Sequence, residues 1–135
     1  MRTAWVSREP ERGSATLEIA VLGPALLLLI FAVVQVGLVY FARSLALGAA
    51  QEGVTAARTY EAAPDAGIQR ALAFVSRSAG DSLRDVEVTA ERTATDSVQV
   101  RVSGRALSVL PGFPGLRVSQ SAEAPIERFT TAGTP

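Results

Sequence analysis

The chain contains no cysteine and no histidine, and every basic residue in it is an arginine. Without cysteine, no disulfide framework can stabilise a small domain. Without histidine, the commonest general base and the commonest metal ligand are both missing, which excludes a Ser-His-Asp triad and a zinc site of the usual kind. We therefore expect a protein that is not an enzyme, with no catalytic residues, no metal site and no cofactor.

Charge of one sign is not in excess. The chain has 13 arginines and 13 acidic residues, for a formal net charge of +0. No basic stripe stands out, so nucleic-acid binding has no electrostatic support. No phosphate-binding loop or metal-ligand spacing is present either, and we expect no small-molecule substrate. A length of 135 residues allows one modest domain beside an apolar segment.

That apolar segment runs from Ile19 to Ala42 without a charged residue. As a helix it would extend about 36 Å at about 1.5 Å per residue, which is enough for a bilayer core of about 30 Å. Pro24 falls near its start, where a missing hydrogen bond costs least. Tyr40 and Phe41 mark the far interface, where aromatic rings prefer to lie. The sequence therefore predicts a membrane span over residues 19–42.

Gln35 is the one strongly polar side chain in this run. It is interpreted either as an amide tolerated near the far end of the span or as the donor of a hydrogen bond between helices in an assembly.

The flanking arginines predict the orientation. Arg2, Arg8 and Arg12 precede the span, and only Arg43 follows it closely. Arginine is enriched on the cytoplasmic side, so we expect a cytoplasmic N-terminus and an extracytoplasmic C-terminal domain. A cleaved secretory signal is the competing interpretation, but this run is longer than a signal core of about 7–15 residues. A cut near Ala50 remains an alternative.

The residues before the span suggest a processing junction. Gly13 followed by Ser14 offers a protease an accessible, extended backbone, and Glu18 lies at the helix start, where the helix dipole favours a carboxylate. After a cut at Gly13, the new α-amine of Ser14 could pair with Glu18 of the same chain or of a neighbour. The simpler interpretation is a flexible glycine followed by a dipole-favoured acid.

These elements together resemble the TadE-like proteins, minor pseudopilins of tight-adherence (Flp-type) pili. The shared features are Arg12-Gly13, a small residue at Ser14, the acid Glu18, Pro24 early in a Leu-rich span, the aromatic exit at Tyr40-Phe41, and the pair Glu52-Gly53 in an Ala-rich helix. Ile19 stands where the family usually has an aromatic residue. The resemblance implies cleavage after Gly13 by a prepilin peptidase at the cell membrane. It also implies partners among other pilins, pseudopilins and the pilus assembly platform, and a role in adhesion, with a place in a surface pilus.

Beyond the span, the helical pattern continues to Pro64 as a stem. Small residues recur at close to helical spacing at Ala46, Ala50, Gly53 and Ala57. Such a stripe lets two helix backbones approach closely. It is interpreted either as a contact with neighbouring pilin stems or as a chance product of an Ala-rich chain.

A second, amphipathic helix is predicted from Pro64, with Ile68, Leu72 and Val75 on its buried face and Gly80 as its C-terminal cap. Alternating valines then predict two strands, over residues 85–93 and 96–107, joined by a turn at 93–97. A third strand is predicted over 116–125.

Two contacts are predicted in this region. Glu87 and Arg101 lie on the polar faces of their strands and are expected to pair. Phe113, in the loop of residues 110–115, is expected to plug the core rather than form an exposed contact.

The predicted fold is a membrane-anchored, pilin-like α+β protein: a long N-terminal transmembrane helix continuing outward, an amphipathic helix, and an antiparallel sheet of about three strands. The predicted organisation is a cytoplasmic leader (1–13), a transmembrane and stem helix (14–60), a small extracytoplasmic head (61–125) and a flexible tail (126–135). The rival to a cleaved pseudopilin is an uncleaved single-pass protein whose outer domain scaffolds or binds an envelope component.

Overall fold

The computed structural model describes residues 12–59 and 62–128. The predicted leader lies outside the described residues except for its last two positions, as does the predicted tail from residue 129 onward. The chain comprises two compact units, Met1–Val33 and Val34–Pro135, which we call the N-terminal unit and the head unit. One helix, α1 (Arg12–Ala57), contributes residues to both.

α1 forms because its sequence is rich in Leu and Ala, which are strong helix formers, and because no charge interrupts it between Ile19 and Ala42. Pro24 lies inside the helix and cannot donate the usual backbone hydrogen bond. The side chains described from Gly13 to Ile30 are all exposed.

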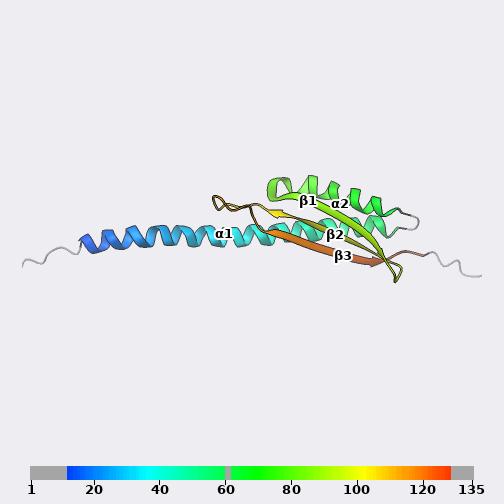
Figure 1. Ribbon diagram of the computed structural model, residues 1–135, viewed down its shortest axis with the longest axis horizontal. Helices are drawn as coiled ribbons and strands as arrows, with labels where there is room; N and C mark the ends of the chain where they lie inside the picture. Colours follow the sequence, from blue (N-terminus) through cyan, green and yellow to red (C-terminus); the bar gives the residue numbers. More distant parts are fainter. Residues whose placement is uncertain (1–11, 60–61, 129–135) are drawn as a thin grey trace, which may run out of the picture. The chain divides into compact units, whose positions relative to one another are not determined.

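The head unit begins at Val34, before the predicted boundary at residue 61, because the second half of α1 supplies much of its core. It also contains α2 (Pro64–Ser78), a short 3-10 turn η1 (Gly80–Ser82), and the strands β1 (Leu83–Thr93), β2 (Ser97–Ala106) and β3 (Arg117–Pro125). The strands form an antiparallel sheet in the order β1-β2-β3. Figure 1 shows the sheet running alongside α2 and this part of α1. The predicted α+β fold class is confirmed.

Both helices lie on one face of the sheet. Val98, Val100 and Val102 of β2 are almost fully buried, while the alternate residue Arg101 is exposed. A Cβ added to Gly53 of α1 would be 2.9 Å from Val100, and one added to Gly67 of α2 would be 3.4 Å from the same side chain. Val100 therefore lies beneath the point where the two helices meet.

α2 begins at Pro64, as predicted, and Gly80 follows its last turn with a left-handed φ of +49°. Its buried face differs from the prediction. Gly67, Ala71 and Val75 are the buried residues, and Leu72 is 38% exposed. Small side chains take the inner positions because α2 lies too close to α1 to admit larger ones.

Two predicted contacts are wrong. Arg101 lies opposite Thr89, and Glu87 instead pairs with Arg117 of β3 at 2.9 Å. A register shift between Arg84 and Glu87, with Asp85 at φ 51°, displaces this end of β1. Phe113 does not plug the core, because its side chain is 43% exposed.

Candidate functional site

The predicted processing junction lies in the first turn of α1. Gly13 is exposed, and a Cβ placed on it would meet no atom within 4 Å. Its backbone is therefore accessible, but it is helical rather than extended. Ser14 follows in the same turn.

Glu18 lies one turn further along the same helix. Its side chain is exposed, and it forms no ion pair with any residue of the described part of the chain. The neighbouring side chains of Leu17 and Ile19 are both 71% exposed. The carboxylate thus stands alone on an apolar surface, available to a cation brought from elsewhere.

The apolar segment has the length and composition to cross a membrane. The candidate span lies within Ala15–Ala57, and its most apolar stretch of 18 residues has a mean hydropathy of 2.6. Only 6% of that stretch is buried, whereas the core helix of a soluble protein is mostly buried. A helix that is apolar all round and is not covered by the rest of its own chain must bury that surface in a bilayer or against other proteins. This helix suggests membrane anchoring.

The far end of the predicted span belongs to the head unit. Tyr40 and Phe41 are exposed, as an interfacial position requires, but Ala42 has no exposed surface and lies in the core. The last predicted span residue therefore faces protein rather than lipid.

Gln35 has a role that neither interpretation of the sequence contained. Its side chain is only 6% exposed. Its Nε2 donates to the carbonyl of Leu107 at 3.1 Å, and its Oε1 accepts from the backbone N–H of Val109 at 3.1 Å. One side-chain amide thus clamps the β2–β3 connection to α1, within the same chain.

The stripe of small residues is covered by the chain's own head. Ala46, Ala50 and Ala57 are at most 4% exposed, and Gly53 approaches the backbone oxygen of Gly67. Glu52 and Arg70 add an exposed ion pair between α1 and α2 at 3.0 Å. This face is therefore not free to contact neighbouring stems. A cut near Ala50 would remove core residues on the N-terminal side of it.

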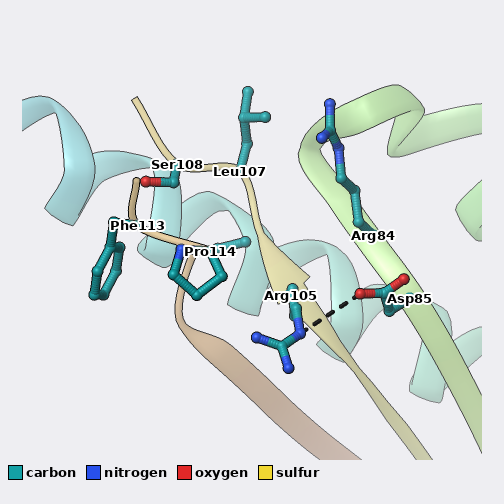
Figure 2. A pocket seen from close by; sticks show the side chains of 8 residues that line it. Arg84, Asp85, Arg105, Leu107, Ser108, Phe113 and Pro114 are labelled. Atoms are coloured by element: carbon teal, nitrogen blue, oxygen red, sulfur yellow. Dashed lines mark ion pairs between the residues drawn. The ribbon is translucent and has the colours of Figure 1, made fainter. Parts of the chain in front are cut away.

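A second feature, which the sequence analysis did not predict, lies where β1 begins, β2 ends and β3 begins. The register places Arg84, Arg105 and Arg117 directly opposite one another, and we call these three residues the arginine row. Arg84 and Arg105 line an open hollow with Phe113 and Pro114 (Figure 2). Asp85 forms an ion pair with Arg105 at 3.5 Å. The signal in the sequence is an arginine near the start of β1, the end of β2 and the start of β3, but only the register aligns them.

Among the described residues, no group of three or more Asp or Glu side chains is arranged to hold a metal ion. Two features of α1 remain as candidate functional sites. One is the exposed start of the helix with Glu18, and the other is the β2–β3 loop that Gln35 holds.

Comparison with known proteins bears on the first of these. The family model described as "TadE-like protein" matches residues 13–55. No curated protein and no solved structure matches the chain. The matched segment starts at Gly13 and contains Glu18, the apolar run and most of the small-residue stripe, so the resemblance inferred from the sequence is confirmed. The match supports the interpretation that this protein is associated with a tight-adherence pilus. Over residues 13–55, about a third of its length, the chain is thus similar to the TadE-like proteins.

Proposed function

We propose that this protein is a minor pseudopilin that takes part in assembling an adhesive Flp/Tad-type pilus after its leader is removed. The observation that carries the proposal is the coincidence of the family match with the exposed helix start. The match begins at Gly13, and α1 presents Glu18 on an otherwise apolar surface. The role is structural rather than enzymatic.

In this proposal a prepilin peptidase at the cytoplasmic face of the membrane cuts after Gly13. The first helical turn must open for a protease to bind it, and glycine eases this because it destabilises a helix by roughly 0.5–1 kcal/mol relative to alanine. The cut releases the α-amine of Ser14, four residues before Glu18. Four residues rise about 6 Å along a helix, so the amine lies within reach of the carboxylate of its own chain or of a neighbour.

The pairing gives Glu18 a purpose during assembly. A lone carboxylate costs about 2.5–3.5 kcal/mol at the centre of a membrane and less near its surface. In the assembled state, a neighbouring subunit's amine would offset that cost. The exposed apolar side chains of α1 anchor the chain before assembly and then contact other pilins or pseudopilins on the assembly platform. The N-terminus is cytoplasmic and the head unit extracytoplasmic.

The first test is the N-terminus of the mature protein. Intact-mass analysis of protein purified from membranes with an active prepilin peptidase should give a chain that begins at Ser14. Gly13→Val should leave the leader in place, whereas Gly23→Val, at a glycine of the same helix equally free of neighbours, should be processed normally.

Retention of Met1 under these conditions would overturn the proposal and favour the uncleaved envelope-binding protein. A chain that starts after Ala50 would indicate a secreted domain.

The second test separates insertion from assembly. Glu18→Ala should reach the membrane fraction normally, because removal of a carboxylate lowers the cost of insertion. It should be depleted from sheared pili, and loss of a pairing worth about 1.4 kcal/mol would reduce incorporation about tenfold. Glu18→Asp, which keeps the charge, should retain more incorporation. Normal piliation by Glu18→Ala, in cells that need this protein, would refute the pairing.

A further inference from the structure

The connection between β2 and β3 is an apolar loop bounded by charge. From Ala106 to Leu116 it carries no charged residue, and Arg105 and Arg117 flank it. Phe113 and Leu116 are 43% and 49% exposed. Leu116 lies beside Tyr40, Val36 and Arg43 of α1, so the apolar surfaces of the loop and the helix are continuous. We call residues 107–116 the apolar loop.

Gln35 fixes the level of this loop along α1. A helix needs about 20 residues to cross a bilayer core, and every window of about 20 residues within the uncharged run from Ile19 to Ala42 includes Gln35. Arg43, the first charge beyond the run, lies eight residues further on, which is about 12 Å along the helix axis. The backbone that Gln35 clamps is therefore held level with the apolar part of α1.

Part of the backbone of the apolar loop is hydrogen-bonded within the protein, as backbone at that depth requires. Irregular backbone is tolerated in a membrane only where its polar groups are satisfied by protein. Gln35 bonds to Leu107 and Val109, Ala106 donates to the carbonyl of Leu116 at 2.9 Å, and Phe113 donates to that of Leu110 at 3.2 Å. The Ser108 hydroxyl accepts from the N–H of Leu110 at 3.2 Å.

The arginine row forms a charged boundary at the edge of the apolar loop. Like charges directly opposite one another destabilise a sheet, so three aligned arginines need compensation. Asp85 and Glu87 pair with two of them, and Arg84 has no ion-pair partner among the described residues. Arginine binds phosphate through its planar guanidinium, and basic residues are attracted to anionic lipid surfaces. The row lies at the end of the sheet from which the apolar loop extends.

We propose that the apolar loop is a second membrane-contacting element, with Phe113 and Leu116 inserted among phospholipids beside α1 and the arginine row at the level of their phosphates. The occupant of this surface is the bilayer rather than a protein, because the surface is continuous with the candidate span. The inference rests on membrane anchoring by α1 and is independent of pilus assembly.

Depth-dependent fluorescence quenching tests the insertion. The chain has a single tryptophan, Trp5, which is first replaced in Trp5→Phe. In that background the full chain carries Phe113→Trp, or Leu116→Trp as a second reporter. It is reconstituted into vesicles of phosphatidylcholine and phosphatidylglycerol with acyl chains brominated near the glycerol. We expect loss of most of the fluorescence from either position, together with a blue shift.

Two matched positions make the result decisive. Leu28→Trp, in the candidate span, should be quenched by bromine placed deep in the chains. Ala94→Trp, at an exposed position in the turn at the opposite end of β2, should not be quenched, because the ten residues of β2 separate its two ends by about 30 Å. Absence of quenching at 113 and 116 with quenching at 28 would overturn the inference. Absence at 28 as well would instead overturn membrane anchoring.

A blue shift at position 113 without quenching would indicate that another protein molecule covers the loop, and would also overturn the inference.

The arginine row is tested with Arg84→Gln in the Phe113→Trp background, which should reduce quenching in anionic vesicles. Arg101→Gln, on the same polar face but in the middle of β2, should have no effect. Equal quenching in both variants would exclude a role for the row.

Discussion

At the scale of single residues, Gln35 shows how one amide inside an apolar run can be accommodated. Its hydrogen bonds reach Leu107 and Val109, which are separated from it by 72 and 74 residues along the chain. Both groups of the amide are used, so neither is left unpaired in a nonpolar environment. Gln35 was predicted to be either tolerated or shared with another helix, because the sequence does not reveal that a loop of the same chain returns to its level.

Replacement of Gln35 by leucine tests this clamp. Gln35→Leu preserves the volume but leaves the carbonyl of Leu107 and the N–H of Val109 without their partner. We expect the free energy of unfolding of the head unit to fall by about 1–3 kcal/mol, the cost of leaving partly buried polar groups unpaired. Thermal unfolding in detergent, followed by circular dichroism, measures the change.

The control is Val36→Leu, at the adjacent and largely exposed position. It should alter stability by less than about 0.5 kcal/mol, as most exposed substitutions do. Equal effects of the two substitutions would contradict the clamp.

At the scale of elements, the two parts of α1 have different surroundings. In the N-terminal unit most of its described side chains are apolar and exposed, whereas in the head unit its small residues form one side of the core. Gly53 and Gly67 mark the closest approach of α1 and α2, where a Cβ on either would meet atoms within 3.0 Å. The stripe of small residues was interpreted either as a contact with neighbouring stems or as a chance pattern, whereas the structure packs it against α2 and the sheet of the same chain.

Two identical substitutions in α1 distinguish packing from helix propensity. Gly53→Ala should destabilise the head unit by about 1–3 kcal/mol, because the added methyl overlaps the backbone oxygen of Gly67 and the side chain of Val100. Gly37→Ala, where nothing lies within 4 Å, should be neutral or stabilise the helix by up to about 1 kcal/mol. Chemical denaturation in detergent compares them, and a stabilising Gly53→Ala would exclude the close contact.

At the scale of the whole molecule, the folded unit is not the segment that follows the membrane helix. It begins at Val34 and incorporates the stem, because the strands and α2 together are too small to enclose a core alone. The core contains five residues of α1 before Gln51: Ala42, Leu45, Ala46, Ala49 and Ala50.

This organisation predicts where the chain can be shortened. A chain of residues 34–135 should unfold cooperatively in detergent, since it keeps the complete core. A chain of residues 51–135 should show no cooperative transition, since the sheet would lose the helix that covers it. Circular dichroism during heating distinguishes the two, and a cooperative transition in the shorter chain would contradict this account of the core.

The sequence by itself determined the elements of this protein. The uncharged run, the alternating valines and the position of Pro64 set the long helix, the strands and the second helix, because these signals depend on residues close together in the chain. The combination of Gly13 and Glu18 before the run, Pro24 within it, the aromatic exit and the Glu52-Gly53 pair indicated a resemblance to the TadE-like family, which the match over residues 13–55 confirms.

Only the tertiary structure decided which elements meet. The partner of Gln35, the crossing at Gly53 and Gly67, and the alignment of Arg84, Arg105 and Arg117 depend on strand register and on contacts between residues distant in sequence. A register shift at Asp85 also replaced the expected pairing of Glu87. Such contacts follow from how the whole core packs, and the local pattern of the chain carries no record of them.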